Sequence, residues 1–595
     1  MVSSISASRN SDSCPDWAMA GDCHGPPIPS MRQKSARSEM RSVFRLCDVS
    51  LRSVSMRMAR YCGAIVSAAA MVSACERYDT TWFDDGPTQG APILEGFFGG
   101  VAGDDPRSVL AAREALARGG TAADAAVAYF FMAAVSYPST SSLASGGVCM
   151  NYDEGDNQAR LIDFRNAPVA ATNTFVTRPT SVPGSVRGMF LLHADSGAIA
   201  WQDLIVPAER AARFGVPVSR ALARDLQLVG EALLADEAAR KVFGAPDGGL
   251  LGEGDQMVQL DLSGMLSFIR TRGAGDFYVG YAARQFSEAA QTIGIPLTFD
   301  EMRAYAPVWA EETYQARVPQ VIYGAEATVH APGPGFDSGA SALNAFDMLR
   351  DDNALVTALS DGSADHLIAE VALRTSVART MRPGEAPDGE LDDLLMVSYS
   401  PQHATPLFEL PAPPSVLMES PATSSVTAVD AYGNAVTCVL TMNNLFGNGR
   451  VAPGTGILLA AAPGDTRGDG LSLLPVIAVN ETVREVVFAG SVSGGVVSGP
   501  VMATVMAQLA ETDATLAEAI ARPRVYHPGE PNFVVVEPTV GDRVVEELVE
   551  LGHEVRVVPE LGRVNGIFCP DGLRNGSESC AMVSDPRAFG LAVGG

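Results

Sequence analysis

The 595-residue chain has almost no lysine, since Lys34 and Lys241 are the only two and arginine carries nearly all of its positive charge. Acidic residues outnumber basic ones, and the formal net charge is −27. Binding to nucleic acid needs clustered cations that displace counterions, so we expect no nucleic-acid partner. An anionic substrate would have to be bound by a few local positive groups.

Histidine and cysteine are also scarce. The seven histidines contain no His-x-x-x-His pair, and the nine cysteines contain no Cys-x-x-Cys pair. Zinc sites are commonly built from such closely spaced ligands, so the sequence predicts no metal site, and we expect no cofactor. The spacing does not exclude a serine–histidine triad, but the chain has no Gly-x-Ser-x-Gly elbow to support one.

The apolar run near the N-terminus, residues 61–74, is too short to span a bilayer. It follows Arg57 and Arg60 and ends in Val-Ser-Ala-Cys, with Cys75 as the last residue. This ending is similar to a bacterial lipobox, in which the cysteine is lipidated. An ordinary signal peptide and a short core helix are the alternatives.

Residues 1–55 are rich in Ser, Arg and Pro and have no sustained periodicity, and translation starting at Met56 or Met58 would omit them. We expect residues 1–75 to be an N-terminal extension with a lipoprotein-type signal peptide and residues 76–94 to be a linker. The mature protein is expected to be exported to the periplasm or cell envelope. It would contact a membrane only through its lipid anchor.

The rest of the chain alternates between helical and extended patterns. Helix periodicity on both sides of Gly119-Gly120 predicts two helices, with Thr121 as the N-cap of the second. Residues 146–168 are typical of a β-hairpin, residues 180–352 are mostly helical, and a further helix is expected over residues 501–520. Strands with helices before and after them indicate a layered α/β or α+β architecture.

The clearest local signal is a hairpin, SVTAVDAY-GN-AVTCVLTMN, at residues 425–443. A three-residue loop ending at Gly433 fixes the register of its two strands. On that register Thr423 faces Thr441, with their Cβ atoms roughly 5 Å apart, and Asn443 projects from the same face. Two facing threonines are usually no more than a favourable β contact.

Four cysteines follow the signal region, namely Cys149, Cys438, Cys569 and Cys580. The last two flank the turn-rich segment PDGLRNGSES. They form either a hairpin disulfide in an oxidising compartment or two buried thiols.

The motifs GGTAADAAVA, DFRNAP, PTSVPGSVRGM, VDAYGNAV, TGILL and DPRAFG occur in this order between residues 99 and 594. This ordered series resembles the γ-glutamyltransferases, which are N-terminal-nucleophile hydrolases. Any one of these fragments alone would be a weak match, but the series is specific. The resemblance implies an α+β fold, a four-layer αββα sandwich, made as a precursor that cuts itself into two subunits.

The resemblance assigns the nucleophile to Thr423 and the cut to the bond between Ala422 and Thr423. Residues 95–422 would form the large subunit and residues 423–595 the small one. A threonine hydroxyl is a poor nucleophile without an adjacent base. The α-amine freed on Thr423 has a reference pKa of roughly 7.7–8.0, which suits a general base near neutral pH.

The same match assigns roles to further residues. Thr441 would form a hydrogen bond with Thr423 and orient it, and the backbone N–H groups of Gly494 and Gly495 would stabilise the oxyanion. Arg165 would bind the substrate α-carboxylate through its guanidinium fork. Without the resemblance, the glycines would be a simple turn and Arg165 an ordinary ion-pair residue. The other expected substrate-binding residues are Asn443, Asp465 and Ser472.

The chain departs from the family pattern around the glutamate pocket. Ala462 stands at the position of a glutamine, Leu471 replaces one serine of a pair, and the segment after Asp465 is too short for the usual lid loop. A hydrogen bond to a charged group is worth about 1.5–3 kcal/mol. These changes should therefore weaken selectivity for γ-glutamyl groups.

The sequence thus predicts a glutathione hydrolase or γ-glutamyltransferase that acts on glutathione-like amides. It would form a γ-glutamyl ester on Thr423 and pass the acyl group to water, an amino acid or a peptide. One alternative is a related amidase or acylase with another acyl specificity, such as glutaryl. A second alternative is an uncleaved, non-catalytic surface lipoprotein.

Overall fold

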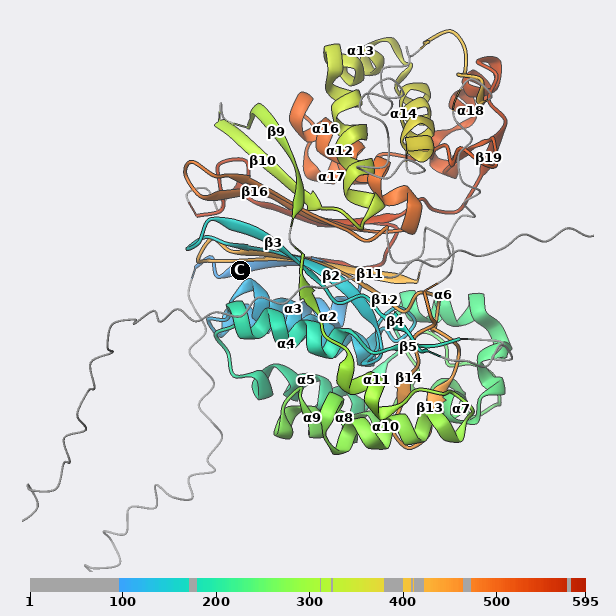
Figure 1. Ribbon diagram of the computed structural model, residues 1–595. Helices are drawn as coiled ribbons and strands as arrows, with labels where there is room; N and C mark the ends of the chain where they lie inside the picture. The colour runs from blue at the N-terminus through green and yellow to red at the C-terminus, as the bar shows by residue number, and fades with distance from the viewer. Residues whose placement is uncertain are drawn as a thin grey trace, which may run out of the picture. The chain divides into compact units, whose positions relative to one another are not determined.

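The computed structural model describes residues 96–170, 179–310, 312–322, 325–378, 400–407, 410, 422–463, 472–574 and 579–595. They belong to one unit of the chain, Pro87–Gly595. Two large antiparallel sheets form its centre, and helices cover their outer faces (Figure 1). The expected α+β class is confirmed.

The first sheet has seven strands, many of which are neighbours in space but distant in the sequence. Their order is β22 (Leu591–Gly594), β1 (Gly99–Gly103), β11 (Thr423–Asp430), β12 (Ala435–Thr441), β2 (Gly146–Asp153), β3 (Gln158–Asp163) and β8 (Val308–Trp309). Every residue of β11 and β12 is buried. The predicted hairpin therefore lies inside the sheet, with a strand from before residue 422 on each side.

The second sheet has six strands. Their order is β21 (Ala581–Ser584), β20 (Arg563–Phe568), β16 (Glu485–Ser493), β15 (Leu474–Asn480), β10 (Ala325–Pro332) and β9 (Thr313–Ile322). Shorter strands pair elsewhere: β4 (Ala167–Pro168) with β5 (Ser181–Val182), β6 (Val216–Pro217) with β7 (Gln256–Met257), and β13 (Val451–Ala452) with β14 (Ile457–Leu458). A small third sheet contains β17 (Val525–Tyr526), β18 (Val534–Val536) and β19 (Val555–Val557).

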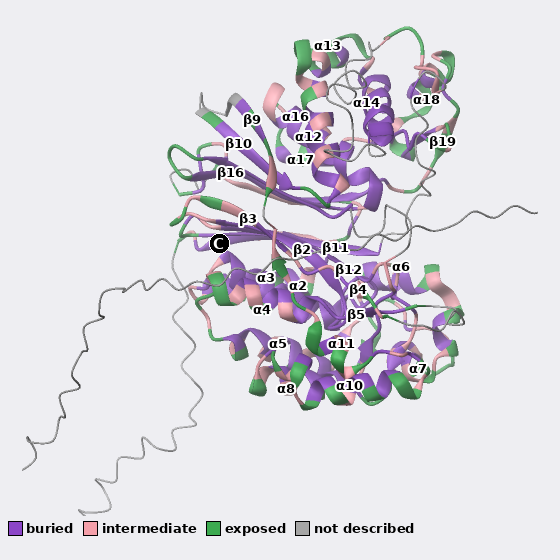
Figure 2. Ribbon diagram, in the orientation of Figure 1, coloured by how far each residue is buried: buried purple, intermediate pink, exposed green. Residues whose placement is uncertain are grey.

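The two large sheets face each other across a buried hydrophobic layer (Figure 2). Ala435 and Val439 of β12 share a cluster there with Ile477 of β15. Because side chains alternate along a strand, Val436 and Leu440 point to the other face, where they join the helices. The hairpin is thus packed on both faces, which explains why nearly all of its positions are small or apolar.

Helices on the outer face of the first sheet include α2 (Pro106–Ala117), α3 (Ala122–Ser136), α4 (Ser185–Ser196) and α5 (Trp201–Phe214). Farther along the chain on this side of the molecule are α6 (Arg220–Val229), α7 (Glu237–Phe243), α8 (Leu260–Arg272), α9 (Asp276–Val279), α10 (Tyr281–Thr292) and α11 (Phe299–Ala304) (Figure 1). The second sheet is covered by α12 (Asp337–Arg350), α13 (Ala354–Asp361), α14 (Ala364–Ala378), α16 (Ser498–Glu511) and α17 (Leu516–Ala521), with α18 (Asp542–Glu550) near the end of the chain.

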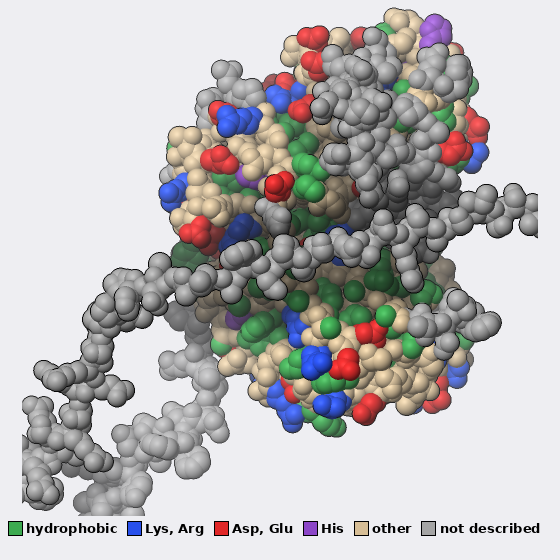
Figure 3. Space-filling model, in the orientation of Figure 1, with side chains coloured by type: hydrophobic (Ala, Val, Ile, Leu, Met, Phe, Trp, Pro, Cys, Tyr) green, Lys and Arg blue, Asp and Glu red, His purple; other side chains and the backbone are tan. Residues whose placement is uncertain are grey.

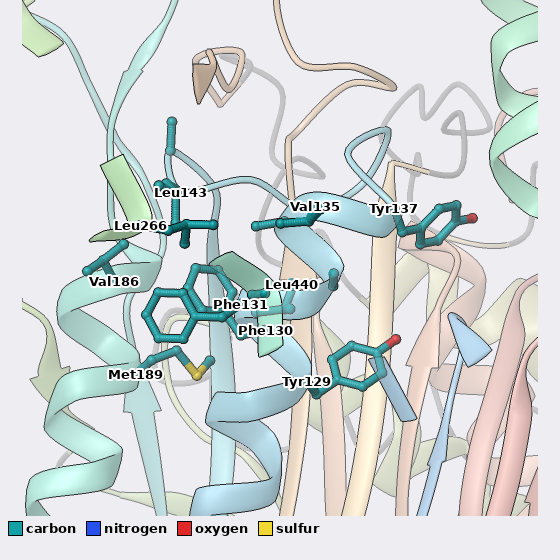
Figure 4. Packing of buried hydrophobic residues seen from close by; sticks show 14 of the residues in the cluster. Tyr129, Phe130, Phe131, Val135, Tyr137, Leu143, Val186, Met189, Leu266 and Leu440 are labelled. Carbon is teal, nitrogen blue, oxygen red and sulfur yellow. The ribbon is translucent and has the colours of Figure 1, made fainter. Parts of the chain in front are cut away.

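Every residue of α3 is buried. Figure 4 shows Phe130 and Phe131 of this helix packed near Met189 of α4, while Tyr129 and Tyr137 point away from that aromatic pair. The Tyr129 hydroxyl lies 3.1 Å from the Ser424 hydroxyl of β11, and the hydroxyl of Tyr137, the C-cap residue of α3, accepts a hydrogen bond from Arg563 of β20. Helix α3 thus contributes apolar packing on one side and polar groups on the other.

Several local predictions are confirmed. Helix α2 ends at Ala117 before the Gly-Gly break, and Thr121 caps α3 in a capping box with Asp124. Strands β2 and β3 form the predicted antiparallel pair. The capping box matters because it satisfies two backbone N–H groups that the first helical turn leaves without partners.

One prediction was incomplete and one was wrong. Residues 180–352 are mostly helical, as expected, but the strands β9 and β10 at residues 313–332 were not predicted. The single helix expected over residues 501–520 is two helices, since α16 ends at Glu511 and Thr515 caps α17. The Thr515 hydroxyl accepts a hydrogen bond from the N–H of Glu518, and the Glu518 carboxylate accepts one from the N–H of Thr515. This capping box starts a new helix.

Two disulfides are present in the described residues. Cys569–Cys580 closes the hairpin beside β20, which resolves the two open alternatives in favour of a disulfide. Cys149–Cys438 joins β2 to β12 and was not predicted. Of the helices in these residues, none combines the length and the apolar character needed to cross a bilayer.

Candidate active site

The predicted hairpin register is confirmed. Thr423 is the first residue of β11 and lies opposite Thr441, the last residue of β12. At the other end, Gly433 closes the loop with a φ of +102°, a left-handed conformation that glycine adopts without strain. The loop thus sets the register, and the register brings the two threonines together.

The hydroxyl of Thr423 is buried without a hydrogen-bond partner among the described residues. The residue is only 8% exposed. Leaving a buried hydroxyl unpaired costs about 1–3 kcal/mol, so each such group calls for an explanation, and a catalytic role is one. The unpaired oxygen belongs to the residue that follows Ala422, next to the bond proposed to be cut.

The carbonyl of Ala422 is held by the hairpin. It accepts a hydrogen bond from the N–H of Met442 at 3.2 Å, which extends the β11–β12 ladder by one residue. This N–H donor polarises the carbonyl that the Thr423 hydroxyl would attack. Such a donor stabilises negative charge that develops on a carbonyl oxygen.

Thr441 does not form the expected hydroxyl contact with Thr423 among the described residues. Its oxygen instead accepts a hydrogen bond from the N–H of Asn443 at 2.9 Å. Asn443 has a φ of +62°, and its side chain donates to the Ala461 carbonyl at 2.8 Å. The turn after β12 therefore holds the Thr441 hydroxyl. In the uncut chain the two threonines are paired in the sheet, but their hydroxyls are not bonded to each other.

A buried arginine holds the backbone of Thr423 from the second sheet. Arg563 of β20 is 1% exposed and donates to the Thr423 carbonyl at 3.2 Å and to the Tyr137 hydroxyl at 3.3 Å. Burial disfavours its charged form, but Tyr137 and Asp104 raise the pKa of Arg563 above its ordinary value overall. Arg563 therefore remains a cation beneath the proposed nucleophile.

Asp104 balances this cation from the end of β1. Burial raises the pKa of the Asp104 carboxyl, while the charge of Arg563 lowers it. Its oxygens accept three hydrogen bonds, from the Ser425 N–H at 2.9 Å, the Asn565 amide at 2.7 Å and the Ser493 hydroxyl at 3.2 Å. This network connects the two sheets around Thr423. The sequence interpretation missed it, although a charged residue beginning the otherwise uncharged strand RVNGIF was a usable signal.

Gly494 follows β16, and Gly495 begins a short 3-10 helix, Gly495–Val497, that directly precedes α16. Gly495 has a φ of +66°, and a Cβ on Gly494 would lie 2.6 Å from the Cα of Gly562. Ser493, the residue before the two glycines, is the strand partner of Arg563, and Arg563 contacts Thr423. The glycine pair therefore lies near the nucleophile. Their N–H groups lie at the N-terminal end of helical structure, where the helix dipole favours negative charge.

Three further predicted positions have different outcomes. Ser472 is buried, and its carbonyl accepts a hydrogen bond from the Ser498 hydroxyl at the start of α16. It therefore lies next to the first residue of α16, three residues after Gly495. Asp465 and Cys75 lie outside the described residues, as do Leu471 and the segment expected to lack the lid, so their roles stay predictions.

Arg165 lies in an open pocket of about 300 Å³. Residues lining this pocket include Asp163, Arg165, Asn166, Tyr305, Asn443 and Pro463. The pocket is continuous with the hairpin, because Asn443 bonds to Thr441. Figure 3 shows acidic and basic side chains interspersed over the face that it draws, so an anionic substrate would depend on single arginines such as Arg165.

The Arg165 fork is already engaged. Its Nε donates to Asp163 at 3.0 Å, its Nη2 donates to the same carboxylate at 2.7 Å, and its Nη1 donates to the Gly335 carbonyl at 3.2 Å. The guanidinium also stacks on the Phe336 ring at 4.0 Å. Arginine has five N–H donors, and these bonds use three of them. A substrate carboxylate would therefore bind an arginine whose charge Asp163 largely neutralises.

One group of residues has the composition of a metal site. His366, Glu370 and His553 are buried, and their ligand atoms lie within 4.8 Å of one another. The group is hydrogen-bonded internally: His366 Nδ1 lies 2.9 Å from His553 Nε2, and Glu370 pairs with Arg374 at 2.7 Å. Burial, together with His366, lowers the pKa of His553 to about 4. The cluster links α14 to the segment before β19 and is separate from the Thr423 network.

The chain is similar in sequence to one family of known proteins. The family model described as gamma-glutamyltranspeptidase matches residues 108–468 and 471–595. The chain is 27% identical over 539 residues to the glutathione hydrolase proenzyme of Escherichia coli (strain K12), covering 82% of this chain and 91% of that protein. It is 26% identical over 557 residues to the glutathione hydrolase proenzyme of Bacillus subtilis (strain 168), covering 83% and 91%.

Solved structures show the same fold. The cephalosporin acylase from Bacillus halodurans matches with a TM-score of 0.69 at 20% identity, covering 84% of this chain and 96% of that one. At this identity, the likeness concerns the arrangement of sheets and helices.

Proposed function

Because the chain belongs to the gamma-glutamyltranspeptidase family, we propose that it is a self-processing amide hydrolase or acyltransferase with Thr423 as its nucleophile. The observation that carries this proposal is the buried, unpartnered Thr423 hydroxyl next to the Ala422 carbonyl. Residues 95–422 and 423–595 are then the two products of self-cleavage.

Self-cleavage begins when the Thr423 oxygen attacks the Ala422 carbonyl carbon. The Met442 N–H, which already donates to that carbonyl oxygen, stabilises the resulting oxyanion. The C–N bond then breaks, the nitrogen takes up the hydroxyl proton, and an ester joins Ala422 to the Thr423 side chain. Water hydrolyses the ester and leaves a carboxylate on Ala422 and a free amine and hydroxyl on Thr423.

Turnover uses the amine made by this cut. It accepts the Thr423 hydroxyl proton as the oxygen attacks the substrate amide, and it then passes the proton to the leaving amine. Gly494 and Gly495 are assigned to the oxyanion, and Arg563 holds the Thr423 carbonyl so that the residue keeps its orientation. Water, an amino acid or a peptide then accepts the acyl group from the ester.

We assign the acyl group to the γ-glutamyl class, with Arg165, Asn443, Asp465 and Ser472 as its binding residues. Arg165 and Asn443 line one pocket, which supports this assignment. Glutathione-like amides are the proposed donors. The chemistry requires no cofactor and no metal.

A second candidate is favoured by the state of Arg165. Asp163 neutralises this arginine, and Ala462 lacks the polar group expected at its position. Both features weaken the recognition of a glutamate head group and favour an acylase that accepts an acyl chain without an amino-acid head, such as glutaryl.

A panel of p-nitroanilides tests the proposal. The γ-glutamyl anilide should give a higher kcat/KM than the glutaryl anilide, and equal or better glutaryl turnover would favour the second candidate. No turnover of either anilide by an uncut chain would favour the non-catalytic alternative.

Export to the periplasm or cell envelope, with a lipid anchor at Cys75, is part of the proposal. The two disulfides support it, because disulfides persist in oxidising compartments and are rare in the cytosol. Labelling of cells with radioactive palmitate tests the anchor: incorporation that is lost in Cys75→Ala is expected, and unlabelled protein would contradict it.

A further inference from the structure

A buried disulfide crosses between two adjacent strands of the first sheet. Cys149 of β2 and Cys438 of β12 lie directly opposite each other in the strand register and are bonded. Both are fully buried, in the hydrophobic layer that also contains α3. They are separated by 289 residues in the sequence.

The bond between Ala422 and Thr423 lies between these two cysteines in the sequence. Self-cleavage would leave Cys149 in the fragment 95–422 and Cys438 in the fragment 423–595. We propose that the processed protein is a covalent heterodimer whose two chains are joined by the Cys149–Cys438 disulfide. The inference rests on the proposed self-cleavage, and it adds a chemical link that the cut does not remove.

No other cysteine pair in residues 76–595 can make this link. Apart from Cys149 and Cys438, that range contains only Cys569 and Cys580. Those two are bonded to each other, and both lie in the small fragment. Breaking the Cys149–Cys438 bond therefore leaves only non-covalent contacts between the chains.

The position of the bond gives it a role in the site. Thr441 lies three residues after Cys438 on β12, opposite Gly146 of the large fragment. A slip of one residue between these strands would turn Thr441 to the opposite face of the sheet. A covalent bond at Cys438 blocks that slip after the cut, so it keeps the strand beside the nucleophile in register with the large fragment.

The bond is made by oxidation of the two thiols, which lose two electrons and two protons to a disulfide-containing oxidant. Both sulfurs are enclosed in the folded protein, so external thiols reach them only when the sheet opens. The proposed link therefore persists in the native enzyme and is reduced after denaturation.

Gel electrophoresis of the alkylated, denatured protein with and without dithiothreitol tests the link. One species without reductant and two species with it are expected. Two species under both conditions would overturn the proposal. One species under both conditions would mean that self-cleavage fails, which is a failure of the proposed function.

A separate cut distinguishes the two failures. A site-specific protease sequence inserted within residues 411–421 of the Thr423→Ala variant allows the chain to be cut without its own chemistry. The cut chain should run as one species without reductant and as two with it. Two species without reductant would overturn the link whatever the outcome of self-cleavage.

Matched variants identify the cysteines. Cys438→Ser should release the fragments without reductant, whereas the double variant Cys569→Ser/Cys580→Ser should leave them joined. The opposite pattern would overturn the assignment. If Cys438→Ser does not fold, mass spectrometry of a non-reduced digest of the wild type decides: a peptide pair joined through Cys149 and Cys438 supports the link, and its absence overturns it.

Discussion

The nucleophile side and the acyl-binding side of the candidate site are built differently. On the nucleophile side, Thr423 lies in a central strand, and buried Arg563 donates to its carbonyl. The Tyr137 hydroxyl accepts from Arg563, and the buried Asp104 carboxylate lies in the same network. On the acyl side, Arg165 lines an open pocket and is paired with a neighbouring carboxylate. Substitutions around the buried network carry large energetic costs, whereas an open pocket tolerates change. We therefore expect substitutions on the acyl side to change substrate choice without loss of the chemistry.

The largest expected effect is loss of the cut in Thr423→Ala. Without the hydroxyl, neither self-cleavage nor acyl transfer has a nucleophile, so only the full-length chain and no amidase activity should be found. Denaturing gels under reducing conditions and an anilide assay measure this. Thr427→Ala, which alters another buried threonine of β11, is the control and should still cut. Two fragments from Thr423→Ala would contradict the assignment.

The second expected effect is a loss of stability in Arg563→Met. Removing this buried cation takes away the positive charge that acts on the buried Asp104 carboxyl and the donor to the Thr423 carbonyl. Removing one of two opposite buried charges typically costs about 3–5 kcal/mol. Urea unfolding of wild type and variant measures the difference. Arg556→Met, which alters an exposed arginine of β19, should cost less than about 1 kcal/mol. Equal losses in both variants would show that the nucleophile side is no more tightly built than the surface.

Gly494→Ala tests the oxyanion site without touching the nucleophile. The added Cβ would lie 2.6 Å from the Cα of Gly562, so the backbone must shift and its N–H donor with it. Loss of one such donor typically lowers kcat by about 10²–10³-fold. Self-cleavage should continue, because the Met442 N–H serves the Ala422 carbonyl.

Gly264→Ala on α8, where a Cβ meets open space, is the control for this substitution. It should leave kcat unchanged. A kcat within threefold of wild type in Gly494→Ala would remove this glycine from the mechanism.

Arg165→Gln sharpens the comparison from the acyl side. Loss of the hydrogen-bonded cation should raise KM for the γ-glutamyl anilide by about 10–100-fold, following the usual 1.5–3 kcal/mol for such a bond. KM for an uncharged acyl anilide should stay within about threefold, and the cut should be normal. Arg160→Gln on strand β3, five residues before Arg165 and paired with Asp195, is the matched control. Unchanged γ-glutamyl KM would favour the acylase alternative.

The smallest expected effect concerns pH and lies away from both sides of the site. Because the folded chain holds the pKa of His553 near 4, below the reference value of 6.5, the unfolded chain binds the proton first as pH falls. The free energy of unfolding should therefore decrease between pH 6.5 and pH 4, by about 2–3 kcal/mol from this residue. Urea unfolding across this range measures the slope, and His553→Gln should reduce it. Parallel slopes in the two proteins would contradict this origin of the acid sensitivity.

The hairpin could be predicted from sequence because its information is local. Alternation with period two and the glycine loop set the register of β11 and β12 without knowledge of any other strand. The break between α2 and α3 was equally local, since Gly119-Gly120 and Thr121 mark it directly.

The rest depended on contacts between distant segments. Strand β9 lies at the edge of its sheet and contains Pro319, so its sequence alternates weakly and was taken as part of a helical region. The Cys149–Cys438 bond follows from the pairing of β2 with β12, which local patterning does not specify. The same holds for the Arg563–Asp104 network, which joins the start of β20 to the end of β1. The capping residue Thr515 was readable but was overlooked.

Intact mass spectrometry of the reduced, purified protein tests the central claim most directly. The account predicts a small chain that begins with an unmodified Thr423 and runs to Gly595, accompanied by a large chain that ends at Ala422. An active preparation in which the chain is unbroken, or is broken at another bond, would contradict it.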